Sequence, residues 1–396
     1  MATMQPSRRQ MLARLAGATG AGLVFSLPAA RLALAAPSAR SKAPSADRLV
    51  VVLLRGALDG LAAVPAIGDP AWLSLRPQAE ADQARYGAPL PLDGQFALHP
   101  GLAHLHRWYG EGSLLVLHAA ASGYRERSHF DAQQLLESGG ARPFELSSGW
   151  LGRALAANDG RGVALSPSLP LALRGAPGAS SWAPTRAEGA DADLLARVQS
   201  LYRNDAQLGP LFQRAAEQHL KPMQDSPADG AGFIALAQQA GRFLAADDGP
   251  SVAWLDSNGW DTHTQQAGRL SRLLPNLDAG LAALRTALGP RWASTTVLVM
   301  TEFGRSAAMN GSGGTDHGTA GVAVLAGGAV AGGRVQADWP GLSRPQLFEA
   351  RDLKATTDIR ALIKPVLQRH LGLATAQIEQ TVLPGSPAAL TGLWRA

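Results

Sequence analysis

Six apolar residues stand together at Leu49-Val50-Val51-Val52-Leu53-Leu54. An uninterrupted apolar run rich in β-branched residues predicts a strand buried on both faces of a parallel sheet. Four further runs of this type occur at residues 114–117, 252–255, 297–300 and 322–325. The first run is therefore expected to form a central strand of a larger sheet.

Helical patterns lie between these runs, most clearly over residues 270–288, where leucines recur every three or four positions. Strands that alternate with helices predict an α/β fold with a doubly wound, mostly parallel sheet sandwiched by helices. Residues 141–249 differ, since they are rich in Pro, Ala and Gly at first and then helical in pattern. We interpret them as a mostly helical insertion or cap.

The first residues carry a targeting pattern. Ser7-Arg8-Arg9-Gln10-Met11-Leu12 is a twin-arginine motif, and Ala33-Leu34-Ala35 has the form of a cleavage site. Residues 1–35 are predicted to be a twin-arginine signal peptide, 36–46 a linker and 47–396 the main domain. A membrane anchor is the alternative, but Pro28 and Arg31 interrupt the apolar segment. We expect a periplasmic or secreted protein without a stable membrane anchor, which meets the twin-arginine translocase during export.

Composition restricts the partners and the ligands. The formal charge is +5, but the predicted signal holds four arginines and no acidic residue, so the remainder carries only +1. No nucleic-acid partner follows from such a balance. The chain has no cysteine, so disulfides and thiolate ligands are excluded and any metal would be held by nitrogen and oxygen.

Polar clusters follow four of the predicted strands. The carboxyl ends of parallel strands meet at one edge of a sheet, so these clusters are expected to converge. A convergent set of His and carboxylate side chains is what a metal site with N and O ligands requires. The clusters contain Asp59 after the first strand, Ser128 and His129 after the second, Asp261 and His263 after the third, and Glu302, Arg305, Asp316 and His317 after the fourth.

Simpler interpretations exist for several of these residues. Asp59-Gly60 suits a turn, and Asp261 with Thr262-His263 suits a helix cap. Residues 311–314 suit a flexible loop better than a phosphate cradle. Arg125, Arg127 and Arg305 are either surface charges or groups that clamp an oxyanion. The Gly-x-Ser-x-Gly elbow of α/β-hydrolases is absent from the sequence.

A series of short motifs in one order along the chain resembles the exported bacterial family called domain of unknown function 1501. These motifs are Arg55-Gly56, Asp59-Gly60-Leu61, Leu98-His99-Pro100, Arg127-Ser128-His129-Phe130-Asp131, Gly149-Trp150-Leu151, Gly259-Trp260-Asp261-Thr262-His263, Thr301-Glu302-Phe303-Gly304-Arg305, Gly314-Thr315-Asp316-His317-Gly318 and Asp338-Trp339-Pro340-Gly341-Leu342. The family is similar, remotely, to the alkaline phosphatase and sulfatase superfamily. The resemblance implies that fold, with metal ligands at the ends of strands.

Carried over by motif, the resemblance implies metal ligands at Asp59, Asp261, His263 and His317, with Ser128 in the nucleophile loop. One departure is Glu302-Phe303, which stands where the superfamily usually has an Asp-His pair. We therefore predict a divalent-metal site (Zn, Mn, Mg or Ca) and the hydrolysis of an anionic phosphate or sulfate ester. The alternative is a non-catalytic exported binding or assembly protein that acts with another exported protein encoded nearby. The predicted metal ligands are Asp59, Asp261, His263, Glu302 and His317, and the predicted catalytic residues are Ser128, His129, Arg127 and Arg305.

Overall fold

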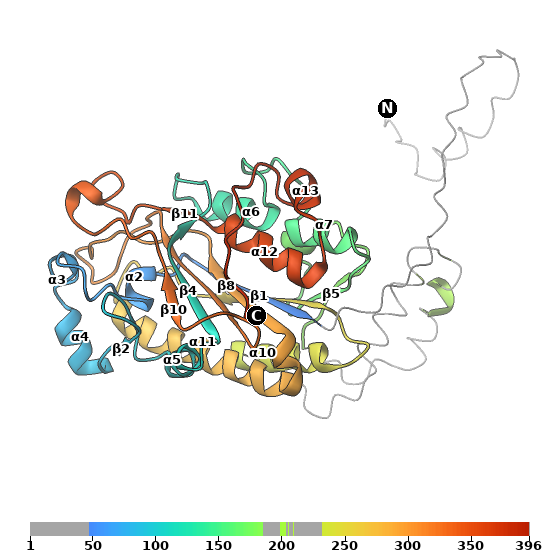
Figure 1. Cartoon of the computed structure of the whole chain (residues 1–396), viewed down its shortest axis with the longest axis horizontal. Helices are drawn as coiled ribbons and strands as arrows, with labels where there is room; N and C mark the ends of the chain where they lie inside the picture. The colour runs from blue at the N-terminus through green and yellow to red at the C-terminus, as the bar shows by residue number, and fades with distance from the viewer. Residues whose placement is uncertain (1–46, 185–198, 203–204, 206–208, 210–231, 396) are drawn as a thin grey trace, which may run out of the picture. The chain divides into compact units, whose positions relative to one another are not determined.

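The structure is a computed structural model that describes residues 47–184, 199–202, 205, 209 and 232–395 (Figure 1). The predicted signal peptide and linker lie outside the described residues. So does part of the segment predicted as a helical insertion. The described residues belong to one compact unit. None of the helices in this described part is long and apolar enough to cross a membrane.

The main sheet has nine strands in the order β10-β4-β9-β8-β1-β7-β5-β6, with β11 added beside β4. Strand β1 pairs in parallel with both β7 and β8, as its apolar run predicts. Strand β9 is antiparallel to β8 and to β4. The prediction of a doubly wound, mostly parallel sheet is confirmed. The strands are β1 (Arg48–Arg55), β4 (Leu114–Ala121), β5 (Gly162–Ala164), β6 (Ala179–Ser181), β7 (Val252–Asn258), β8 (Thr295–Thr301), β9 (Gly321–Gly327), β10 (Arg334–Gln336) and β11 (Thr357–Asp358).

Alternate side chains of β1 enter two separate cores. Val50, Val52 and Leu54 pack in the first core, and Leu49, Val51 and Leu53 pack in the second. Because successive strand residues point to opposite faces, a continuous apolar run serves both cores. Figure 1 shows helices on both sides of the sheet. The first core includes residues of α5 (Ala103–Gly110), α10 (Phe233–Ala245) and α11 (Gln266–Leu288), and the second includes residues of α6 (His129–Ser138), α7 (Trp150–Ala156) and α12 (Ile359–Leu371).

The described part of residues 141–249 is built into this sheet. It supplies β5, which pairs with β7, and β6, which pairs with β5. Helix α10 packs along α11. In its described residues the segment is therefore part of the α/β core, to which it contributes the two short strands as well as helices α7 and α10. The strands β5 and β6 were not recognised in this Pro/Ala/Gly-rich stretch because three-residue strands carry too little periodicity.

The small elements after β1 form a separate layer beside α11. Asp59 caps α2, since its Oδ1 accepts hydrogen bonds from the amides of Leu61 and Ala62 at 3.0 and 3.2 Å. The elements are α2 (Gly60–Ala63), α3 (Trp72–Leu75), α4 (Ala79–Tyr86) and the hairpin β2 (Leu90–Pro91) with β3 (Ala97–Leu98). Helix α13 (Thr375–Gln377) follows α12.

Candidate metal centre

Four side chains from three loops meet at the carboxyl-terminal edge of the sheet. His129 begins α6 after β4, Asp261 and His263 follow β7, and His317 lies in the loop between β8 and β9. We call these four residues the His/Asp cluster. The convergence expected from parallel strand ends is thus present, and His129, Asp261 and His317 by themselves have the spacing of a group that could hold a metal ion.

The imidazole Nε2 atoms of the cluster face one another. His317 Nε2 lies 2.9 Å from His129 Nε2 and 3.0 Å from His263 Nε2. The Asp261 carboxylate completes the group, with distances of 3.1 Å to His263 Nε2, 3.3 Å to His317 Nε2 and 3.6 Å to His129 Nε2. The ligand atoms of His129, Asp261 and His317 lie within 4.8 Å of one another, and His263 Nε2 lies beside those of Asp261 and His317.

Each imidazole is oriented through its other nitrogen. The Nδ1 atoms of His129, His263 and His317 lie 2.9, 3.1 and 3.0 Å from Glu302 Oε1, Asp316 Oδ1 and the Arg127 carbonyl oxygen. All three partners are acceptors, so each Nδ1 carries the proton and each Nε2 presents a lone pair. Oxygen acceptors behind ligating imidazoles are typical of metal sites, because they fix the tautomer and the ring orientation.

Glu302 lies behind His129 rather than among the four donors. Its Oε1 also accepts hydrogen bonds from the Gly56 amide and from Gln133 Nε2, both at 2.8 Å. Burial opposes ionisation, but the hydrogen bonds from His129, Gln133 and Gly56 outweigh it and hold the pKa of Glu302 below its usual value. The structure therefore places Glu302, predicted to be a metal ligand, behind His129 as a group that orients the imidazole.

The surroundings of the cluster favour a neutral His317 imidazole and an ionised Asp261 carboxylate. Burial lowers the pKa of His317, and the neighbouring His129 and Arg305 lower it further. Burial raises the pKa of Asp261, but the hydrogen bond and charge of Arg305 outweigh burial and leave it lowered. These are the protonation states that metal ligands need.

Arg305 supports the cluster from beneath, with a side chain that is 0% exposed. Its Nη2 donates to Asp261 Oδ1, while further N–H groups donate to the carbonyls of Gly56, Ala57 and Thr315 at 2.7, 2.8 and 3.1 Å. Its Nη2 also donates to the Trp260 carbonyl at 3.3 Å, so Arg305 holds Asp261 and four backbone oxygens. In this structure the guanidinium predicted to bind the anion of a substrate instead supports the cluster.

Arg127 is also occupied elsewhere. Its guanidinium donates to Asp352 Oδ2 at 2.9 Å and to Glu349 Oε2 at 2.5 Å. Its carbonyl oxygen accepts from His317, as described above. Arg127 has a positive φ of 60°, which a non-glycine residue adopts only when its surroundings require it. The prediction of Arg127 as an anion-binding group is replaced by a role in orienting His317.

Two other predicted residues lie outside the His/Asp cluster. Asp59 Oδ2 accepts hydrogen bonds from Arg76 Nη1 at 2.6 Å and from Gln266 Nε2 at 2.7 Å, so the structure does not bring this predicted metal ligand into the cluster. Ser128 is the N-cap residue of α6 and neighbours the Tyr124 side chain. Among the described residues, no hydrogen bond joins its hydroxyl to the three imidazoles. His129, predicted to be catalytic, takes the inward position instead.

Two supporting residues carry no recognisable sequence signal for their roles. Asp316 orients His263, although its sequence position suggested only that it lies near the site. Arg351 comes from a distant loop, and its Nη2 donates to the His317 carbonyl oxygen at 2.9 Å. Its side chain is 41% exposed. No motif spacing predicts such a contact, because it depends on how the loop after β10 returns to the sheet edge.

The glycine-rich loop offers a matched test of the geometry. A Cβ on Gly314 would lie 2.2 Å from the backbone carbonyl of His263, whereas one on Gly311 would meet nothing within 4 Å. Gly314→Ala is expected to displace His263 and lower metal affinity about tenfold or more, while Gly311→Ala leaves it unchanged. Isothermal titration with Zn²⁺ measures both. Equal affinities for the two variants would contradict this account of the loop.

The sheet and the cluster define an α/β protein with a solvent-accessible His/Asp centre at the edge of its strands. A family model described as protein of unknown function (DUF1501) matches residues 124–382, which is more than half of the chain. The chain belongs to this family, and the family predicted from the motifs is confirmed. A search of curated proteins found no match.

The chain is also similar, at low sequence identity, to several solved structures whose names are those of hydrolases. A putative sulfatase from Bacteroides thetaiotaomicron has 9% identity and a TM-score of 0.42, with 83% of this chain and 71% of that chain covered. A phosphonate monoester hydrolase of Agrobacterium radiobacter has 12% identity and a TM-score of 0.35, with 73% and 70% covered. The TAB5 alkaline phosphatase, in a mutant form, has 12% identity and a TM-score of 0.37, with 73% and 93% covered.

Proposed function

We propose that this protein is a metal-dependent hydrolase of phosphate or sulfate esters. One observation carries the proposal: His129, Asp261 and His317 form a group that could hold a metal ion, His263 Nε2 lies 3.0 Å from His317 Nε2, and each Nδ1 is held by an oxygen acceptor. Lone pairs at such short separations repel one another unless a cation lies between them. The donor set therefore suits a bound divalent ion.

Three nitrogen donors and one oxygen donor favour Zn²⁺ over the other candidate ions. Mn²⁺ is the next candidate, and Mg²⁺ and Ca²⁺ prefer oxygen ligands. The side chains of Asp261 and His263 are 45% and 42% exposed, so an ester can approach the centre from solvent. An ion bound there would act as a Lewis acid and stabilise the negative charge that develops on the ester oxygens.

The protein groups around the centre have separate tasks in this proposal. Arg305 holds Asp261 in place, and Glu302 and Asp316 keep two imidazoles oriented through their Nδ1 protons. Arg351 is the cation assigned to the anionic ester, because its guanidinium is partly exposed beside His317. Within the described residues no imidazole is hydrogen-bonded to the Ser128 hydroxyl, so we assign the attack to water and not to Ser128.

Removal and return of metal tests the reaction. Chelated protein should hydrolyse neither aryl phosphate, aryl phosphodiester nor aryl sulfate, and Zn²⁺ or Mn²⁺ should restore turnover of at least one. Ser128→Ala should retain activity within about tenfold, since water attacks in this scheme. Turnover is followed by release of the coloured aryl alcohol. Loss of all activity in a metal-loaded Ser128→Ala protein would instead indicate covalent attack.

A second result would remove the hydrolase proposal altogether. Folded, metal-loaded protein that is inactive on all three ester classes would favour the non-catalytic binding or assembly protein. Glu302-Phe303, the departure that suggested such a protein, does not leave the cluster short of a donor in this structure, because His129 supplies one.

Export remains a proposal that rests on the sequence alone. Arg8-Arg9 and the small residues at 33–35 are expected to direct the folded chain through the twin-arginine translocase to the periplasm or beyond. Replacing both arginines with lysine should leave uncleaved precursor in the cytoplasm. Fractionation and immunoblotting measure this, and normal processing of the double variant would contradict the proposal.

A further inference from the structure

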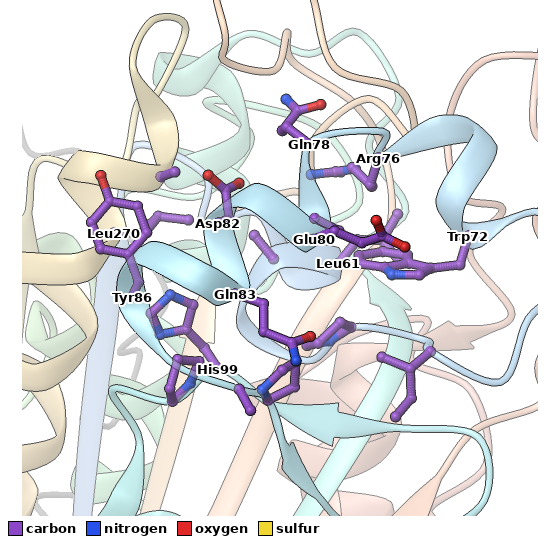
Figure 2. Close-up of a pocket in the computed structure, with 18 of the residues that line it drawn as sticks. Leu61, Trp72, Arg76, Gln78, Glu80, Asp82, Gln83, Tyr86, His99 and Leu270 are labelled. Atoms are coloured by element: carbon purple, nitrogen blue, oxygen red, sulfur yellow. The ribbon is translucent and has the colours of Figure 1, made fainter.

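A second cavity, away from the His/Asp cluster, opens between the α2–α4 layer and the start of α11 (Figure 2). We call it the α4 pocket. Its volume is about 490 Å³, within the range of small-molecule sites. Helix α4 covers it without burying a single residue of its own. The space beneath this helix is therefore not filled by the protein's own side chains.

The walls of the α4 pocket are largely apolar. Leu61, Trp72 and Leu270 are buried side chains that line it, and Tyr86 adds a second aromatic ring. Figure 2 shows Trp72 at one end of the pocket and Tyr86 with Leu270 at the other. Apolar walls that face a void lose dispersion contacts, which a ligand of matching size would restore.

The floor carries charge but offers no free cation. Arg76 donates from Nε to the Ala307 carbonyl at 2.8 Å, from Nη2 to the Ser306 carbonyl at 3.1 Å, and from both terminal nitrogens to Asp59. The pairing with the positive Arg76 helps to hold the pKa of Asp59 low, although burial opposes it. The Asp59 carboxylate neutralises the charge of Arg76, so Arg76 offers no free positive charge to a ligand.

Gln266 separates the pocket from the metal centre. Its Nε2 donates to Asp59, and its Oε1 accepts from the hydroxyls of Thr262 and Thr315 at 2.8 and 2.6 Å. Thr262 stands between Asp261 and His263 in the chain. A molecule in the α4 pocket would therefore lie behind this polar layer and would not touch the His/Asp cluster.

The polar groups that remain favour a ligand without negative charge. Glu80 and Asp82 line the pocket from α4, and both carry side-chain oxygens at which a cation or a hydrogen-bond donor is favoured. His99 Nδ1 accepts from the Gly101 amide at 3.0 Å, so its Nε2 carries the proton. Arg76 is the one arginine in the lining, and its guanidinium already donates to Asp59 and to two backbone carbonyls.

We infer that the α4 pocket binds an uncharged or singly cationic organic molecule with an aromatic or aliphatic body, separate from the ester site. The apolar walls and two aromatic rings provide most of the contact, and the two α4 carboxylates exclude anions. This ligand class is opposite in charge to the anionic ester assigned to the His/Asp cluster. The inference does not depend on the proposed hydrolase activity.

Two fluorescent probes that differ in charge test it. N-phenyl-1-naphthylamine is uncharged, and 8-anilino-1-naphthalenesulfonate has the same two ring systems with an added sulfonate. Titration should show that the neutral probe binds saturably at one site. The anionic probe should bind with a Kd higher by about tenfold or more. The result should be the same in chelated and zinc-loaded protein. Equal binding of the two probes would overturn the inference.

Variants locate the binding. Ala267 lines the pocket, so Ala267→Trp should fill it and abolish binding of the neutral probe, while Ala267→Ser should leave binding intact. Circular dichroism checks that both variants fold. If Ala267→Trp does not fold, the double variant Glu80→Gln and Asp82→Asn decides, because it should bring the two probe affinities closer together. An unchanged affinity ratio, or undiminished binding to folded Ala267→Trp, would place the probe elsewhere and refute the assignment.

Discussion

Asp261→Asn protein is expected to fold normally but to turn over every ester substrate at the background rate. The oxygens of Asp261 approach all three Nε2 atoms, at 3.1–3.6 Å. An amide in its place has no charge to balance a divalent ion, and it presents a hydrogen-bond donor as well as an acceptor. We expect a loss of at least about 10³-fold in kcat/KM, together with loss of bound metal.

Asp316→Asn is the matched control, because Asp316 is a similarly exposed carboxylate that contacts the side of the His263 ring facing away from the cluster. It contacts His263 through Nδ1 at 3.1 Å and touches none of the Nε2 atoms. Removing such an outer partner costs about 10–100-fold in metal affinity or activity. Metal content by mass spectrometry and aryl-ester turnover separate the two variants. If Asp261→Asn keeps its metal while Asp316→Asn loses it, the inner and outer assignments are reversed.

Arg305→Met is expected to cause the largest loss of stability among the site residues. The four backbone oxygens of Gly56, Ala57, Thr315 and Trp260 would each lose the guanidinium donor. An unsatisfied buried acceptor costs about 1–3 kcal/mol, so we expect a decrease in the free energy of unfolding on the order of 4 kcal/mol. The ion pair with Asp261 adds little to this value, because that carboxylate is almost half exposed. Urea unfolding of metal-free protein measures the change.

Arg351→Met removes the same charge from the partly exposed arginine beside His317. We expect it to lower the free energy of unfolding by less than about 1 kcal/mol, since surface contacts contribute little. It should instead raise KM for the anionic ester with kcat nearly unchanged, because Arg351 is assigned to binding. A stability loss equal to that of Arg305→Met would contradict the structural distinction between the two arginines.

The strands of the central sheet could be predicted because burial on both faces leaves a local mark in the sequence. The run at residues 49–54 became β1, and the runs at 252–255 and 297–300 became its two parallel neighbours. The order of the strands and the antiparallel direction of β9 left no such mark. Pairing joins residues more than two hundred positions apart, and backbone hydrogen bonds do not depend on side-chain type.

The metal centre divides in the same way. Because Asp261 and His263 follow one predicted strand and His317 follows the next, the sequence predicted that the three lie near one another. Whether a side chain becomes a ligand or a supporting group was decided by competition among neighbours. Asp59 pairs with Arg76, and Glu302 accepts a hydrogen bond from His129 Nδ1. Neither carboxylate therefore lies among the donor atoms of the cluster.

By itself the sequence determined the fold class, the family and the loops in which the chemistry is concentrated, since these follow from local periodicity and from motifs. Only the tertiary structure decided which atoms face one another. His129 faces the other imidazoles while Ser128 caps α6, and the Arg305 side chain is buried while that of Arg351 is partly exposed. The physical reason is the range of the interactions. Burial patterns act along the chain within a few residues, whereas hydrogen-bond partners a few ångströms apart in space are chosen from the whole fold.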